Sequence, residues 1–232
     1  MTSSTDSITP GKRKLIAHAL PMFVFIALLA FCGLLKRPGG PFWLAAPEFW
    51  IYPLQTFLCA ALLVFFWREY EFHPLRRTVF ALSIALFVFV LWIAPQQFLH
   101  FPARTVGFNP DTLAANPLSY WTTLILRFLR LVLVVPLVEE IFWRGFLLRY
   151  LISERFEEIR FGTFSWLSFT IVTLAFGLSH SMADWPAALI TGVLYNLVAY
   201  RTRSLTACVL THALTNLALG LWIVATRQWG FW

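Results

Sequence analysis

The chain has 232 residues, of which 59% are hydrophobic and only 12% are Asp, Glu, Lys or Arg. Soluble domains carry about 25% charged residues, and a soluble core of this size could not bury so much apolar surface, so the composition excludes an ordinary soluble protein. The formal net charge of +7 comes mostly from arginines between apolar runs, which favours contact with a bilayer and its anionic head groups over nucleic acid. We therefore predict an all-α polytopic membrane protein.

The N-terminal residues 1–14 are polar and precede the first long apolar run. We predict that they form a disordered cytoplasmic N-terminus and that residues 15–232 form a single membrane domain. A helical span needs about 20 mostly apolar residues. On this criterion we expect a helical bundle of about seven spans (six to eight), at 15–35, 49–67, 78–98, 118–152, 163–183, 186–200 and 204–225.

The fourth of these stretches is too long for one simple span. It contains Arg127 and Arg130 in its first half, so residues 118–130 are expected to lie along the interface before the chain enters the membrane at Leu131. With the N-terminus in the cytoplasm, the connecting segments place 11 Lys and Arg inside and 4 outside. This asymmetry predicts a cytoplasmic N-terminus and a C-terminus on the other side.

Two adjacent carboxylates, Glu139 and Glu140, interrupt this fourth apolar stretch. A charged side chain at bilayer depth costs roughly 2.5–3.5 kcal/mol on insertion scales, so a functional reason for the pair is expected. Arg144 follows Glu140 by four residues, the favoured order for an ion pair on a helix. Glu139 points about 100° away from Glu140, so the two carboxylates cannot share one task.

Three further polar residues lie within apolar spans: His180, His212 and Asn216. His212 and Asn216 are four residues apart and share one helix face. Each of these groups has a structural interpretation, because polar side chains also join membrane helices. Their number favours a shared polar cavity. Carboxylate and imidazole can move a proton from water to a leaving group, and imidazole with carboxamide can stabilise an oxyanion, which suits hydrolysis of an amide or ester.

These residues form three motifs: EExxxR at Glu139–Arg144, FxxxH at Phe176–His180 and HxxxN at His212–Asn216. In order and spacing they resemble the CPBP family of intramembrane proteases, which includes the CAAX prenyl endopeptidases and the bacterial Abi proteins. The resemblance covers about residues 118–220, the expected catalytic core. The run Phe142–Leu151 and the chain length are also similar to a CAAX protease-related branch linked to bacterial exosortase/PEP-CTERM sorting systems.

The resemblance implies a role for each motif residue. Glu139 and His180 would activate the attacking water, and His212 and Asn216 would form the oxyanion site. Glu140 and Arg144 would support the site. The resemblance also implies a bacterial inner membrane location and an intramembrane endopeptidase that acts on a membrane-anchored protein or peptide.

The CPBP family has been described both as metalloproteases and as glutamate-dependent, metal-free proteases. We expect no cofactor and keep a divalent metal such as zinc as the alternative, held by Glu139, His180 and His212. The bilayer and the membrane-anchored substrate are the expected partners, with no nucleic acid, and the sequence does not define an oligomeric state.

Two other functions are compatible with the same polar cavity. A non-catalytic maturation chaperone or immunity protein would keep the polar groups for structure or binding. A proton-coupled transporter would use the acids as a relay and is expected to contain inverted repeats, which the sequence does not show.

Overall fold

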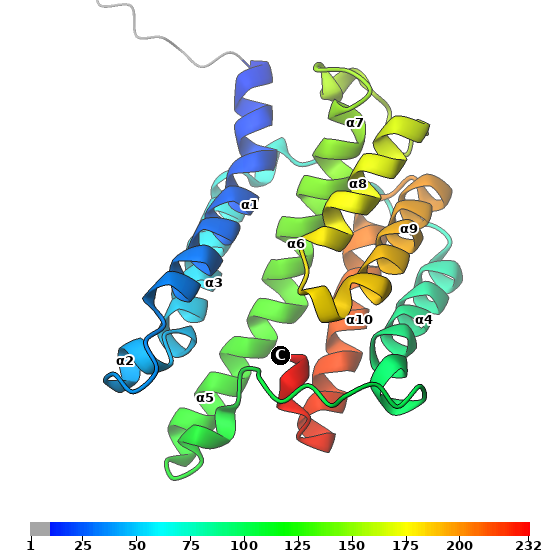
Figure 1. Cartoon of the computed structure of the whole chain (residues 1–232). Coiled ribbons are helices and arrows are strands. Elements are labelled where there is room, and N and C mark those ends of the chain that lie inside the picture. Colours follow the sequence, from blue (N-terminus) through cyan, green and yellow to red (C-terminus); the bar gives the residue numbers. More distant parts are fainter. Residues whose placement is uncertain (1–9) are drawn as a thin grey trace, which may run out of the picture.

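The computed structural model describes residues 10–232, and residues 1–9 of the predicted N-terminal segment lie outside the described residues. Within residues 10–232 the regular elements are helices, which form one bundle (Figure 1). This confirms the all-α polytopic fold class. The first helix begins at Pro10, so residues 10–14 are helical and not disordered as the sequence suggested.

The α-helices are α1 (Pro10–Leu35), α2 (Phe42–Ala45), α3 (Glu48–Phe65), α4 (Thr78–Gln97), α5 (Pro117–Phe128), α6 (Val135–Glu140), α7 (Leu148–Tyr150), α8 (Trp166–Leu178), α9 (Trp185–Thr202) and α10 (Leu205–Thr226). Two π-helical segments, η3 (Leu129–Val134) and η4 (Ile141–Leu147), join α5, α6 and α7. Short 3₁₀ turns are η1 (Trp67–Glu69), η2 (Pro110–Leu113), η5 (Phe156–Glu158), η6 (Met182–Asp184) and η7 (Trp229–Phe231).

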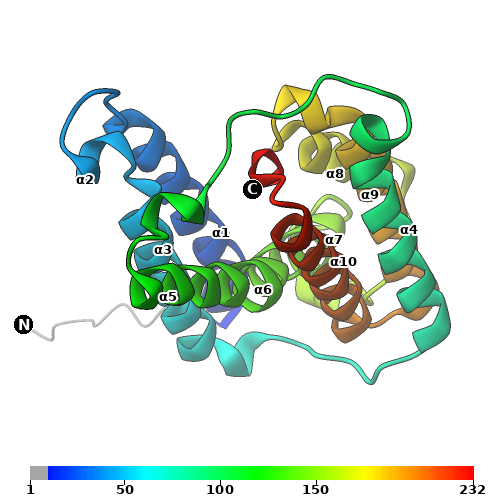
Figure 2. The same ribbon diagram turned by 90° about the horizontal axis from the view of Figure 1, so that it is seen from below.

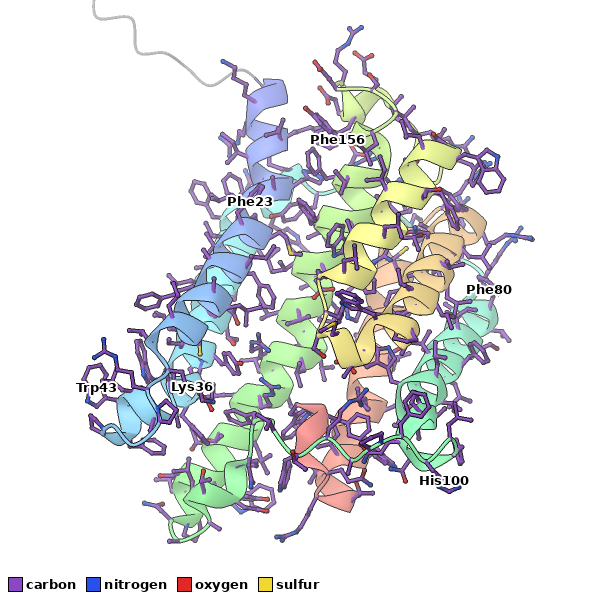
Figure 3. All side chains as sticks on the ribbon, in the orientation of Figure 1. Phe23, Lys36, Trp43, Phe80, His100 and Phe156 are labelled. Carbon is purple, nitrogen blue, oxygen red and sulfur yellow. The ribbon has the colours of Figure 1, made fainter. Side chains whose placement is uncertain are left out.

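Five helical stretches of the described chain are long and apolar enough to cross a membrane: Gly11–Leu35, Glu48–Phe65, Thr78–Gln97, Pro117–Tyr150 and Leu205–Thr226. The outer surface carries large apolar side chains, such as Phe23, Val79 and Leu86, which are 62%, 78% and 62% exposed. A water-soluble monomer rarely exposes so much contiguous apolar surface. The protein is therefore an integral membrane protein, with Phe156 near one end of the bundle and Lys36 and His100 toward the other (Figure 3).

Residues 117–150 form one continuous helical rod that crosses the height of the bundle (Figure 1). Its first half does not lie along the interface, which corrects the expectation for residues 118–130. Arg127 and Arg130 are buried in the bundle. Their guanidinium groups lie over aromatic rings, 4.9 Å from the ring centre of Phe108 and 4.5 Å from that of Tyr52 respectively. Aromatic faces stabilise cations away from water, a contact that the local sequence does not reveal.

The rod is widened on both sides of the glutamate pair by η3 and η4. Pro136 lacks a backbone N–H, and its ring disturbs the preceding turn of helix. The Leu131 carbonyl in that turn accepts a hydrogen bond from Nδ2 of Asn216, at 2.9 Å. Because π-helical turns are rare and frequently occur at functional sites, this widened segment is a candidate site.

Helices α8 and α9 form a hairpin whose turn lies inside the bundle. With 13 residues, α8 is about 20 Å long, shorter than the roughly 30 Å hydrocarbon core. Helix α8 begins near the end of the bundle where α7 lies, the chain turns back about half-way down, and α9 returns to the same end (Figure 1). The predicted spans 163–183 and 186–200 are therefore the two arms of one hairpin.

The view along the bundle shows α6 between two groups of helices (Figure 2). One group contains α1 and α3, and the other contains α4, α8, α9 and α10. The elements α6 and α10 are packed against each other, so the segments that carry the EExxxR and HxxxN motifs lie side by side.

Candidate active site

A cavity of about 270 Å³ lies between α1, η3, α6, the α8–α9 hairpin and α10. Four of the predicted site residues line it: Glu139, His180, His212 and Asn216. The side of the cavity formed by α1 is apolar, with Met22, Phe25, Ile26 and Leu29. The structure thus brings three separate motifs to one amphiphilic cavity, and the other two predicted residues, Glu140 and Arg144, lie behind it.

Glu140 is completely buried and is the centre of a hydrogen-bond network. Its Oε1 accepts hydrogen bonds from Nη1 of Arg144 at 3.0 Å and from Nδ1 of His212 at 2.9 Å. Nε of Arg144 donates to Oδ1 of Asn196 at 3.1 Å, and the amide nitrogen of Asn196 donates to Oγ1 of Thr173 at 3.1 Å. The network ties together α6, η4, α8, α9 and α10. The ion pair of Glu140 and Arg144 was expected, but the bond to His212 was not.

Both histidines are held by Nδ1. Because a carboxylate and a backbone carbonyl only accept hydrogen bonds, Nδ1 of His212 donates to Glu140 and Nδ1 of His180 donates to the Phe176 carbonyl, at 2.8 Å. The ring of His180 also meets the ring of Trp92 edge to face, with centres 5.5 Å apart. In each histidine Nε2 is therefore the ring nitrogen left to accept a proton or bind a ligand.

Glu139 differs from its neighbour Glu140 in both burial and hydrogen bonding. It is partly exposed, lines the cavity and forms no ion pair or hydrogen bond through its side chain within residues 10–232. A carboxylate with unengaged oxygens in a cavity is able to take a proton from water. The structure thus separates the two carboxylates in burial and bonding, while their chemical roles stay predictions.

The alternative of a divalent metal requires the side chains of Glu139, His180 and His212 to lie close together. Within residues 10–232, no group of three His, Cys, Asp or Glu side chains is close enough to hold one metal ion. Glu139, His180 and His212 share a cavity but do not converge, so they do not fit a metal centre in this conformation. The absence of a cofactor in the working protein stays a prediction.

Several cavity residues were missed by the sequence analysis. Arg130 lines the cavity, and its Nε donates to Oε1 of Gln55 at 2.8 Å. Treating every polar residue inside an apolar span as a candidate would have found both residues. Trp92 is one of 11 tryptophans, and nothing in the sequence distinguishes it from the others as a cavity residue.

The fold and the cavity define an integral membrane protein with a Glu/His/Asn site between its helices. Residues 120–218 match the family model described as Type II CAAX prenyl endopeptidase Rce1-like. This match confirms the CPBP resemblance found in the three motifs. No curated protein and no solved structure matches the chain. The narrower resemblance to the exosortase-linked branch stays a prediction.

Proposed function

We propose that the protein is an intramembrane endopeptidase that hydrolyses a peptide bond of a membrane-associated protein or peptide. One observation carries the proposal: Glu139 has no partner within residues 10–232, yet it shares a cavity with His180, His212 and Asn216. The family match to residues 120–218 supports a peptidase.

In the proposed reaction, Glu139 and His180 take a proton from a water molecule as its oxygen attacks the scissile carbonyl carbon. The resulting oxyanion lies beside His212 and Asn216. Glu140 accepts the hydrogen bond from Nδ1 of His212 and so fixes the orientation of the ring, which donates to the oxyanion through Nε2–H when that nitrogen carries a proton. The Asn216 amide has one N–H on the Leu131 carbonyl, which leaves its second N–H for the substrate. The C–N bond then breaks, and the proton taken from water passes to the leaving nitrogen.

We further infer that the N-terminus faces the cytoplasm of a bacterial cell and that the protein lies in the inner membrane. The 11 Lys and Arg assigned to the inside by sequence, in contrast to 4 outside, support this orientation.

The proposal is tested with purified protein and a membrane-anchored substrate. We expect Glu139→Gln and His180→Ala to reduce cleavage by at least about 100-fold, because general acid–base catalysis contributes roughly 10²–10⁴ in rate. Both variants should insert and accumulate normally. Ser179→Ala is the matched control, because Ser179 lines the same cavity while its Oγ donates to the Phe176 carbonyl at 2.8 Å.

Loss of cleavage in Ser179→Ala with full activity in Glu139→Gln would replace the proposal with serine chemistry. If the wild type gives no cleavage product and the cavity variants only reduce partner capture, the protein is the non-catalytic maturation or immunity factor.

A further inference from the structure

We propose that a groove between the start of α8 and the end of α9 binds an anionic phospholipid. The phosphate of the lipid contacts Arg160, Arg201 and Arg203, and one acyl chain lies along α9. Throughout the described residues 10–232, this groove and the catalytic cavity are lined by different side chains. The proposal therefore goes beyond the peptidase activity and does not depend on it.

The groove lies where the head group of a lipid is available. Its volume is about 720 Å³, and it opens between the loop before α8, the first turns of α8 and the second half of α9. These two helix ends lie at the end of the bundle where α7 lies (Figure 1). Phe164 and Trp166 line the groove and are 49% and 74% exposed. Exposed tryptophans of membrane proteins gather at the level of the lipid head groups, so the groove opens at that level.

The three arginines of the groove have no counter-charge. Within residues 10–232, the side chains of Arg160, Arg201 and Arg203 form no ion pair and no hydrogen bond, and all three are exposed in the groove. By contrast, Arg155 in the same loop pairs with Glu158 at 3.3 Å. Neighbouring like charges repel each other, and the fork of a guanidinium matches a phosphate group. A phosphate ligand would therefore relieve the repulsion and engage the free N–H donors.

Backbone contacts hold the arginines together at one end of the groove. Gly162 has a φ of 77°, and a Cβ there would lie 2.8 Å from the Ala199 carbonyl oxygen and 3.0 Å from Cγ of Arg203. The loop before α8 is thus packed closely on the end of α9. The carbonyl of Arg160 accepts hydrogen bonds from the backbone N–H and from Oγ1 of Thr163, at 3.1 and 2.7 Å. This turn keeps Arg160 beside the end of α9, so the cluster is built by the fold.

The apolar part of the groove fits an acyl chain. Val193, Leu197 and Arg201 line the groove at intervals of four residues, so they share one face of α9 and span about 12 Å along the helix. Phe169 of α8 lines the same groove. A charged head and an apolar tail are the features of a lipid, whereas a soluble phosphate would leave the apolar part unused. The amine of a zwitterionic lipid adds a positive charge beside three arginines, which favours an anionic lipid.

The test measures lipid binding to the purified protein in an uncharged detergent, where no charged bilayer surface attracts the lipid. Native mass spectrometry gives the Kd of phosphatidylglycerol and of phosphatidylcholine with the same acyl chains. Hydrogen bonds to a charged group change affinity by roughly 10- to 100-fold. We expect phosphatidylglycerol to bind at least about 10-fold more tightly. The double variant Arg201→Gln/Arg203→Gln should lose this preference, and Arg201→Lys/Arg203→Lys should keep part of it.

Arg68→Gln is the matched control. Arg68 is exposed and lies near the start of α1, where its neighbour Glu69 pairs with Arg13 at 2.6 Å. It lies outside the lining of the groove. The control removes one positive charge from the same end of the bundle and should bind phosphatidylglycerol as tightly as the wild type. Thermal unfolding without added lipid checks that each variant is folded.

Three results would overturn the lipid site. The first is equal affinity of the wild type for the two lipids, or no binding of either. The second is a loss of phosphatidylglycerol binding in Arg68→Gln as large as in the double variant, as diffuse attraction to a basic surface would give. The third is displacement of the lipid by inorganic phosphate at equal concentration, which would make the groove a site for a soluble anion. A wild type that binds phosphatidylglycerol selectively but cleaves no peptide would overturn only the peptidase.

Discussion

The two neighbouring glutamates of α6 differ in burial and in hydrogen bonding. Glu140 is fully buried and bonded to Arg144 and His212. Glu139 is partly exposed in the cavity and has no such bonds within residues 10–232. A buried ion pair stabilises its site only while both partners remain, whereas an unpaired carboxylate is unfavourable for stability and is kept for another reason. This difference agrees with the proposal that Glu140 supports the site and that Glu139 reacts.

The proposed roles of Glu140 and Glu139 predict different effects of substitution on the stability of the protein. Glu140→Gln leaves the buried Arg144 guanidinium without its counter-charge, and removing one partner of a buried pair destabilises by about 3–5 kcal/mol. We expect a clearly lower Tm in detergent, together with reduced activity. Glu139→Gln should keep or raise the Tm and lose activity. Thermal unfolding of the two purified variants checks this, and equal Tm losses in both would contradict the division.

At the scale of elements, the α8–α9 hairpin determines where His180 lies. Close contact of the two helices depends on Gly177, because a Cβ added there would lie 2.7 Å from Cγ and 3.2 Å from Cα of Leu189. A rotamer change of Leu189 can move Cγ but not the backbone Cα, so the tight contact with Cα remains. A larger residue at 177 therefore has to shift the two helices apart slightly, three residues before His180.

We expect Gly177→Ala to destabilise by about 1–3 kcal/mol through overpacking and to lower cleavage, since even a displacement of about 1 Å in a catalytic group slows a reaction by roughly 100-fold. Gly33→Ala on α1 is the control, because a Cβ there meets nothing within 4 Å. Its activity should match the wild type. A Gly177→Ala protein that cleaves normally would show that the hairpin spacing does not position His180. The measurements are the rate of cleavage and the Tm of each variant.

At the scale of the whole molecule, the hairpin lowers the number of membrane spans but leaves the two chain termini on opposite sides of the membrane. Seven predicted spans place the chain termini on opposite sides, and five crossing stretches with one returning hairpin do the same. We predict that green fluorescent protein is fluorescent when fused before Pro10 and that alkaline phosphatase is active when fused after Trp232. Since fluorescence requires the cytoplasm and phosphatase activity requires the outside, the reversed result would contradict the orientation.

Much of this architecture could be predicted from apolar runs. A membrane-spanning helix must satisfy its backbone hydrogen bonds internally, so each span appears in the sequence as a long apolar run. The starts of α3 and α4 lay within one residue of prediction. The hairpin was not predictable in this way, because an arm such as 163–183 has the apolarity of a span, and its shortening depends on contacts with other helices. Buried Arg127 and Arg130 misled the prediction of an interfacial segment for the same reason.

For the site, motif spacing identified the six candidate residues and the Glu140–Arg144 pair. It could not show that His212 is bonded to Glu140 or that Gln55 orients Arg130, because these contacts join residues 72 and 75 positions apart. Such pairings are set by tertiary packing, and the sequence alone carries only the signal that an intramembrane polar residue needs a partner.

The most direct test of peptide-bond hydrolysis by Glu139 is a comparison of protein C-termini, by mass spectrometry, in cells that express the wild type and Glu139→Ala at equal levels. We predict at least one membrane-associated protein whose shortened C-terminus occurs with the wild type and disappears with the variant. Identical C-terminal profiles in the two strains, with both proteins correctly inserted, would contradict the assignment of the protein as a Glu139-dependent intramembrane peptidase.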